Sequence, residues 1–300
     1  MNMLELIQAA TGEMGLSVPT YIAGNTSADA IQQLALLNSV GRKLQRDYDW
    51  QKSIVEYRFN TVYSEQRGTI VTGLSMITGI TDTSMLNTTF QVIGTGINTD
   101  CYIQSVDSAT QVTLNQPVTA SGTFDFNFCQ TKYIWPADYD RIISRTQWDK
   151  SKHWEMMGPE TAQEWQWLKS GYIATGPRIR FRELGGYFQT WPPISTNEYL
   201  GMEYISKYWA ISAGVFAPDK YALSADNDTT IYPDELMIAG LKAAYFSVKG
   251  FDATEFGADF ARQLSIAKAN DGGNRLLSFA PGYPDVLITP ANIPDSGYGT

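Results

Sequence analysis

Residues 66–128 form a block whose pattern differs from the rest of the chain. Short runs in which polar and apolar residues alternate, such as TIVTG, TFQVIGTGI, CYIQSV, QVTLN and TFDFNF, are separated by turn residues. These strand-like runs recur at intervals of about ten residues, which predicts a small β-sandwich or β-barrel. A flexible low-complexity linker is the alternative, and the regular recurrence of Val, Ile and Phe argues against it.

The N-terminal flank carries helix signals instead. Asn2 followed by Glu5 is typical of a capping box at a helix start. Thr26 or Ser27 is placed to cap a longer helix with apolar residues on one side. The stretch SIVEYRFNTVY (53–63) then alternates like a half-buried strand.

The C-terminal flank mixes helix and strand signals. Pro136 predicts a helix start in YIWPADYDRIISRTQW, and a compact helix is expected from Pro159 to Gly171. RIRFRELGGYFQTW predicts a hairpin with a Gly-Gly turn, and NEYLGMEYISKYW follows it as a third strand. A helix that opens at Pro233 and closes at Gly250 is apolar nearly all round, so we expect it to be buried.

These signals predict an α+β fold with four parts. Residues 1–65 and 129–278 are expected to form a mainly helical core with a three-stranded sheet, ending in a helix that stops at Gly272-Gly273. Residues 66–128 are expected to be an inserted all-β domain. Residues 279–300 contain four prolines, so we expect an extended C-terminal arm rather than a helix.

Charge and rare residues exclude several classes of protein. Asp and Glu total 31 against 22 Lys and Arg, a formal charge of −9, which argues against binding nucleic acid by neutralising phosphates. One His and two Cys exclude His-rich or Cys-rich zinc sites and a disulfide framework. The N-terminus resembles no secretion signal, and no apolar run is long enough to span a membrane. We therefore expect synthesis in a cytoplasm, with Cys101 and Cys129 reduced and buried.

Low charge accompanies many aromatic residues. Charged residues make up 18% of the chain, and there are 8 Trp and 17 Tyr. Interfaces between proteins favour Tyr and Trp and contain little Lys and Glu. The composition therefore favours a protein that buries its surface against partners.

Three arginines are the leading candidates for contacts with a partner. Arg178, Arg180 and Arg182 alternate with Ile179 and Phe181, which places all three on one face of a strand. They are suited to contact another protein or, less well, a DNA backbone. A solvated face with local pairs to glutamates (Glu183 or Glu203) is the alternative.

Other polar residues do not form a recognisable active site. No nucleophile can be assigned to His153, and Glu13 is interpreted as a helix-end residue. The acidic stretch SADNDTTIYPDE lacks the residue order of an EF-hand and is interpreted as a polar loop with helix capping. GTGINTD does not open a helix, so it is no nucleotide-binding loop. The sequence therefore predicts no catalytic residue, no cofactor and no metal.

Several ordered blocks carry a resemblance to a known family. They are LIQAATGEMGL, LLNSVGRKLQRDYDW, YDRIISRTQWDKS, MMGPETAQEWQWLKSG, MEYISKYWA and SADNDTTIYPDELMIAGLKAAYFSVKG. Together with the last helix and DGG, these blocks resemble the head-to-tail adaptor proteins of tailed bacteriophages. The resemblance is stronger to adaptors of short-tailed phages related to SU10 and more distant to those of P22-type phages. It covers the chain except for the β block.

The resemblance implies a virion protein that is not an enzyme. Such adaptors form a homo-oligomeric ring, usually of twelve copies, beneath the dodecameric portal at the head–tail junction. The C-terminal arm docks in the portal, the opposite face receives the tail nozzle and sometimes fibres, and genomic DNA passes through the lumen without specific binding. The arm residues implied to contact the portal are Phe279, Tyr283, Val286, Leu287, Ile288, Ile293 and Tyr298.

The acidic composition agrees with this implication, because an acidic channel wall repels DNA phosphates. Two other functions remain open. A peptidoglycan-cleaving tail enzyme would need two carboxyl groups across a cleft. A glycan-binding tail protein would use exposed aromatic side chains of the β block.

Overall fold

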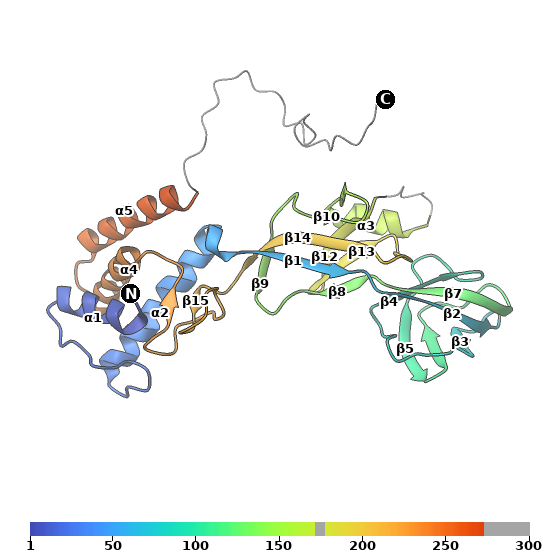
Figure 1. The fold of residues 1–300 in the computed structure, drawn as a ribbon, viewed down its shortest axis with the longest axis horizontal. Coiled ribbons are helices and arrows are strands. Elements are labelled where there is room, and N and C mark those ends of the chain that lie inside the picture. The colour runs from blue at the N-terminus through green and yellow to red at the C-terminus, as the bar shows by residue number, and fades with distance from the viewer. Residues whose placement is uncertain (172–177, 273–300) are drawn as a thin grey trace, which may run out of the picture.

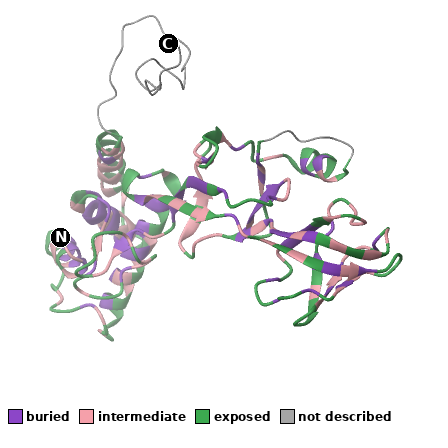
Figure 2. Cartoon of the chain, turned by 45° about the vertical axis from the view of Figure 1, so that its right-hand side comes forward, coloured by how far each residue is buried: buried purple, intermediate pink, exposed green. Residues whose placement is uncertain are grey.

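The computed structural model describes residues 1–171 and 178–272, and this part of the chain is an α+β structure with five α-helices and several antiparallel sheets. Its parts follow one another along a long axis (Figure 1). Four helices lie at one end, two sheets in the middle, and a six-stranded sheet at the other end. Buried residues gather separately in these parts (Figure 2), so the chain has several cores rather than one.

The helical end contains α1 (Met3–Glu13), α2 (Ala28–Asp47), α4 (Asp234–Lys249) and α5 (Thr254–Asp271). The predicted capping box is present: the Asn2 side chain accepts from the Glu5 N–H and the Glu5 carboxylate accepts from the Asn2 N–H, both at 2.9 Å. Ser27 caps α2. Gly250 ends α4 with a φ of 76°, a conformation that favours glycine.

The helix α4 lies at the centre of this end, as its apolar sequence predicts. It packs against α1, α2 and α5. The short strands β15 (Ala210–Ile211) and β16 (Thr229–Thr230) pair beside it. The fully buried side chains of the common core include Met3, Leu6, Ile7, Leu37, Met237, Leu241 and Trp209.

The six-stranded sheet is built from residues 63–130 alone. Its order is β4-β7-β2-β3-β6-β5. In chain order the first strand of this sheet is β2 and the last is β7. These two strands pair along the whole length of β2, so the segment leaves the sheet where it enters. The strands are β2 (Tyr63–Ile70), β3 (Met76–Thr78), β4 (Phe90–Gly94), β5 (Ile103–Ser108), β6 (Gln111–Leu114) and β7 (Gly122–Gln130).

The two edges of this sheet approach each other. The Val92 N–H donates to the carbonyl oxygen of Cys101 at 2.9 Å, and Gln91 forms a bridge with Tyr102. The sheet therefore curls towards a barrel, which shortens its free edges. Its interior holds a separate core that includes the fully buried Phe126.

Both cysteines lie in this region, and both are buried and free, as predicted. Burial raises the pKa of the Cys101 thiol to about 11 and that of the Cys129 thiol to about 12. The thiols are therefore protonated at neutral pH and behave as small apolar side chains.

The middle of the molecule holds two further sheets and one helix. In the first sheet, β14 (Tyr199–Ser206) is central and pairs with β1, β9 and β10, and β11 pairs with β10. The second sheet has the order β12-β13-β8. The remaining bounds are β1 (Ile54–Asn60), β8 (Lys132–Ile134), β9 (Tyr139–Ile142), β10 (Trp148–Asp149), β11 (Trp154–Glu155), α3 (Ala162–Lys169), β12 (Arg180–Leu184) and β13 (Tyr187–Trp191).

Two predictions for this middle part are wrong. Pro136 starts no helix: it lies between β8 and β9, because pairing with distant strands outweighs the local preference of proline for a helix start. The strand after the hairpin does not join it either. The third strand of the hairpin is β8, whereas β14 pairs with β1. β14 is largely buried along its length, which suits a central strand.

Candidate binding concavity between the helices and the central sheet

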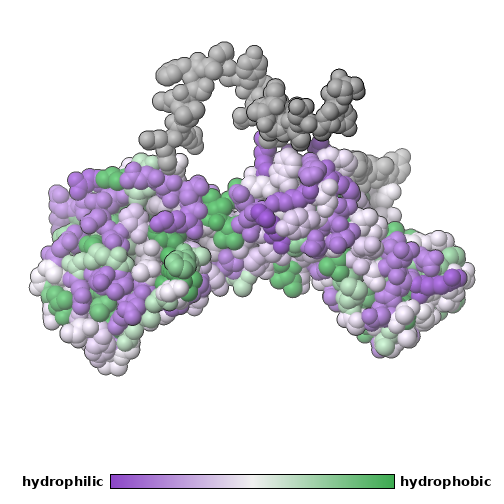
Figure 3. Space-filling model, in the orientation of Figure 1, coloured by the Kyte–Doolittle hydropathy of each residue, from purple (hydrophilic) through white to green (hydrophobic). Residues whose placement is uncertain are grey.

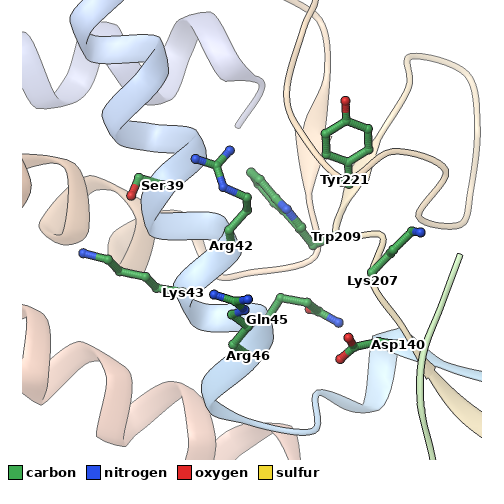
Figure 4. A pocket seen from close by; sticks show the side chains of 9 residues that line it. All are labelled: Ser39, Arg42, Lys43, Gln45, Arg46, Asp140, Lys207, Trp209 and Tyr221. Carbon is green, nitrogen blue, oxygen red and sulfur yellow. The ribbon is translucent and has the colours of Figure 1, made fainter.

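A concavity of about 700 Å³ lies where the helical end meets the five-stranded sheet. We call it the junction concavity. Helix α2 contributes one wall, β9 contributes one residue, and the segment after β14 contributes the rest (Figure 4). The lining residues are Ser39, Arg42, Lys43, Gln45, Arg46, Asp140, Lys207, Trp209 and Tyr221.

Trp209 is the fully buried residue of this lining, and a glycine on α2 makes room for it. A Cβ at Gly41 would lie 2.3 Å from an atom of the indole ring, so a larger residue there would displace the tryptophan. The indole Nε1–H has no hydrogen-bond partner within the described part of the chain. An unpartnered buried donor costs about 1–3 kcal/mol, which the close packing of the indole ring in the helical core offsets.

Buried polar contacts hold the wall behind Trp209 in place. The Gln45 amide donates to the carbonyl oxygen of Ser206, and its Oε1 lies 2.8 Å from the Tyr232 hydroxyl. Burial raises the pKa of Tyr232 above its ordinary value, so this hydroxyl keeps its proton. The concavity therefore has a preorganised floor, whereas its cationic rim is exposed.

Four exposed cations surround this floor: Arg42, Lys43, Arg46 and Lys207. None of them forms an ion pair with any of the residues that the structure describes, although most other lysines of the helical end do, such as Lys220 with Asp228 at 2.9 Å. Figure 4 shows Arg42 and Arg46 on one side of Trp209 and Lys207 with Tyr221 on the other.

Part of this charge has a structural explanation. Arg46 lies in the last turn of α2, where a cation interacts favourably with the helix dipole. Lys207 comes from a different element, so the helix dipole does not account for it. The acidic residue of the lining, Asp140, is bonded to Arg141. The arrangement is suited to binding an anionic group next to an aromatic surface.

The three arginines of the sequence analysis lie elsewhere, on and before β12. The predicted strand begins only at Arg180, so Arg178 precedes it, while Ile179 and Phe181 between the arginines are buried. Arg180 forms an ion pair with Glu160 at 2.6 Å rather than with the predicted glutamates. Arg178 is exposed and Arg182 is half-buried.

The other residues considered in the sequence analysis do not come together in one site. His153 is exposed in the turn between β10 and β11, with a φ of 57°. Glu13 is the last residue of α1 and pairs with Lys242 at 2.5 Å. The implied portal contacts Phe279–Tyr298 lie outside the described residues.

The acidic stretch before α4 is occupied by structural contacts. Asp226 accepts from the N–H groups of Ile22 and Ala23 at 3.0 and 2.8 Å, which ties the loop after α1 to this segment. The buried Asp228 accepts from the Lys220 ammonium and from two backbone N–H groups. Within residues 1–171 and 178–272, no three His, Cys, Asp or Glu side chains gather as a metal site would require.

The sequence did not predict the junction concavity, although the spacing of two of its arginines indicated a basic helix face. Arg42 and Arg46 are four residues apart and therefore share one face of α2. Lys207 and Trp209 follow a strand more than 150 positions later, so only the fold brings them to that face.

Large apolar side chains are exposed along the whole molecule. Figure 3 shows apolar residues spread over several places rather than collected in one patch. The largest exposed fractions are 102% for Phe216, 69% for Ile134, 64% for Tyr221, 63% for Phe251 and 60% for Val248. None of the described helices has the length and apolar character needed to cross a membrane.

Comparison with known proteins adds no relative: no protein-family model matches this chain, and neither does any curated protein.

Proposed function

We propose that this chain is a structural virion protein, the adaptor whose ring joins the portal to the tail of a short-tailed bacteriophage. The observation that carries the proposal is the arrangement of separate cores along one extended chain with large apolar side chains left exposed at every part. An elongated chain with separate parts offers several distinct surfaces to its neighbours, as a subunit that lies between other copies and two further components requires. The resemblance of the helix and strand blocks to phage adaptors supports the same reading.

In this proposal the helical end and the middle sheets form the ring, and residues 66–128 are an inserted module. Support for the module comes from its contiguous sequence, its own core and the pairing of β2 with β7 at its base. A segment that enters and leaves at one place can be added to a ring subunit without disturbing it. The module projects from the ring towards the nozzle, the fibres or neighbouring copies.

The charge of the chain suits a DNA channel. Each copy carries a formal charge of −9, which a ring repeats around its lumen. Such a wall repels DNA phosphates and lets the genome pass without binding. Ring subunits also contact their neighbours through two different surfaces, which agrees with the exposed apolar residues at several places.

Native mass spectrometry of the purified chain mixed with the portal protein of the same virion tests the proposal. We expect a complex of one portal with a ring of twelve copies. A chain that stays monomeric over a wide concentration range and ignores the portal would contradict it.

Removal of residues 279–300 tests the proposed portal-docking arm. We expect the truncated chain to keep the circular dichroism of the full chain and to lose portal association. Unchanged association would contradict the role of the arm and leave the ring proposal open to the mass measurement above.

A further inference from the structure

A projecting tip lies between α4 and α5, at residues 248–255. Val248 and Phe251 are 60% and 63% exposed, and the carboxylates of Asp252 and Glu255 lie beside them in the sequence. We call this segment the α4–α5 tip. It presents an aromatic ring with two carboxylates, and its one cation, Lys249, pairs with Asp29 of α2 at 3.8 Å. These groups complement a cationic site that has an exposed tyrosine ring.

The tip is braced rather than loose. The ring of Phe251 meets that of Phe246 edge to face at 6.1 Å, and Phe246 stacks on Phe256 at 4.2 Å. Asp252 accepts from the Thr254 N–H and hydroxyl, and these bonds hold the pKa of its carboxyl below its ordinary value. The tip is therefore preorganised and charged at neutral pH, which lowers the entropy cost of docking.

The tip and the junction concavity lie on opposite sides of the helical end. In Figure 1 the start of α5 is at the outer, left-hand end of the molecule, whereas the concavity is bounded by Asp140 of β9 and Lys207, on the side that faces the sheets. No residue of the tip belongs to the lining of the concavity. One copy can therefore offer its tip to one neighbour and its concavity to another.

We propose that the α4–α5 tip of one copy docks in the junction concavity of the next copy. Phe251 lies against the exposed ring of Tyr221, and the two carboxylates face the cationic rim. This inference rests on the proposed function, because repeated tip-to-concavity contacts close into a ring.

Two observations favour another copy as the occupant. The concavity of about 700 Å³ has the size of sites that enclose an aromatic group with its neighbours. The net charge of −9 repels a long polyanion such as DNA from a distance, whereas a short acidic tip is attracted locally by the four rim cations, which form no ion pair with the residues that the structure describes.

Charge reversal tests the contact. The concavity variant carries Arg42→Glu and Arg46→Glu, and the tip variant carries Asp252→Lys and Glu255→Lys. We expect the association constant of each variant with itself to fall at least tenfold, because its tip and its concavity now carry like charges. An equimolar mixture is expected to recover it, since each variant then complements the other and the two alternate around the ring. Sedimentation velocity with the portal protein present measures this.

The matched control reverses two basic residues away from both surfaces, Lys52→Glu with Arg145→Glu, and changes the net charge as much as the concavity variant does. We expect it to assemble like the unmodified chain. Circular dichroism shows that every variant is folded.

A covalent test does not depend on charge. Phe251→Cys and Tyr221→Cys are made in separate chains, in which the native thiols stay buried. We expect a disulfide-linked dimer when the two chains are mixed under mild oxidation, and none when Ile134→Cys, on another exposed surface, replaces Tyr221→Cys.

The outcomes separate this inference from the proposed function. Rings that form equally well with every charge variant would overturn the tip contact and leave the adaptor ring intact. So would single variants that fail and a mixture that does not recover, or an oligonucleotide that binds the unmodified chain and not the concavity variant. An unmodified chain that never assembles, with or without the portal, would overturn the proposed function itself.

Discussion

The six-stranded sheet and the helical end are two opposite ways to build a core from this chain. The sheet uses residues 63–130 without interruption, although three of its five pairings (β4 with β7, β2 with β7 and β3 with β6) join strands that are not neighbours in sequence. The helical end combines residues 1–53 with 207–272. A contiguous unit depends on local pattern, whereas a discontinuous one depends on contacts between distant segments.

The polar contacts of the two regions differ in the same way. In the helical end, Asn38 exchanges hydrogen bonds with the backbone of Leu223, 185 positions away. In the sheet, side-chain hydrogen bonds are mostly exposed and join positions within about one hairpin, as Thr113 does with Asp107. We therefore expect the two regions to respond to substitution independently.

The largest effect is expected from Phe126→Ala, which empties the centre of the sheet and costs about 3–5 kcal/mol there. No tryptophan lies within 63–130, so tryptophan fluorescence reports only the rest of the chain. During urea unfolding, circular dichroism should show an earlier transition while the fluorescence transition stays in place. Leu37→Ala in the helical core is the matched substitution and should move the fluorescence transition. Equal shifts of both signals by both variants would mean one cooperative unit.

Asp228→Asn is expected to destabilise the helical end by about 2–3 kcal/mol, because it leaves Lys220 and two backbone donors with a weaker acceptor. Burial acts to raise the pKa of Asp228, but the bonds from Ser224, Ala225 and Lys220 outweigh it, so the pKa lies below its ordinary value.

The sign of the pH dependence follows from that lowered pKa. A carboxyl whose pKa is lower in the folded state stabilises the fold above its unfolded pKa of about 3.9, and this contribution is lost as the pH falls through the folded value. The difference between the unmodified chain and Asp228→Asn should therefore be full at pH 6 and shrink below about pH 4. A difference that grows on acidification would contradict the assignment.

Gly41→Ala and Gly12→Ala compare two helical glycines with opposite surroundings. The new Cβ at Gly41 meets Trp209 at 2.3 Å, whereas nothing lies within 4 Å of the one at Gly12. We expect Gly41→Ala to lower the free energy of unfolding by about 2 kcal/mol and Gly12→Ala to raise it by about 0.5–1 kcal/mol. Thermal unfolding measures both, and equal effects would show that Trp209 can move away freely.

The smallest effect is expected at the two capping boxes. Asn2→Ala and Thr161→Ala each remove a side-chain acceptor from a helix start and should cost about 1 kcal/mol. Amide hydrogen exchange should show faster exchange at Glu5 and Glu164 respectively. If Asn2→Ala also speeds exchange in the six-stranded sheet, the two regions are coupled.

The elements that the sequence predicts well are those whose signals are local. The capping box at Asn2, the cap at Ser27 and the stop at Gly250 depend on residues within a few positions of each other, and all are present. The alternating runs of residues 66–128 became strands for the same reason. Pro136 shows the limit, because distant strands decided the structure around it.

The junction concavity could not be predicted from the sequence for the same reason, because it is formed by segments that are distant in the chain. The sequence determined that Arg42 and Arg46 share a helix face, that the chain is acidic and aromatic, and that its cysteines are buried. Only the tertiary structure placed Lys207, Trp209 and Tyr221 opposite that face and put the α4–α5 tip on the other side of the helices. The physical reason is range: caps, turns and periodicity act over a few residues, whereas a binding surface is formed by side chains that meet only when distant segments pack.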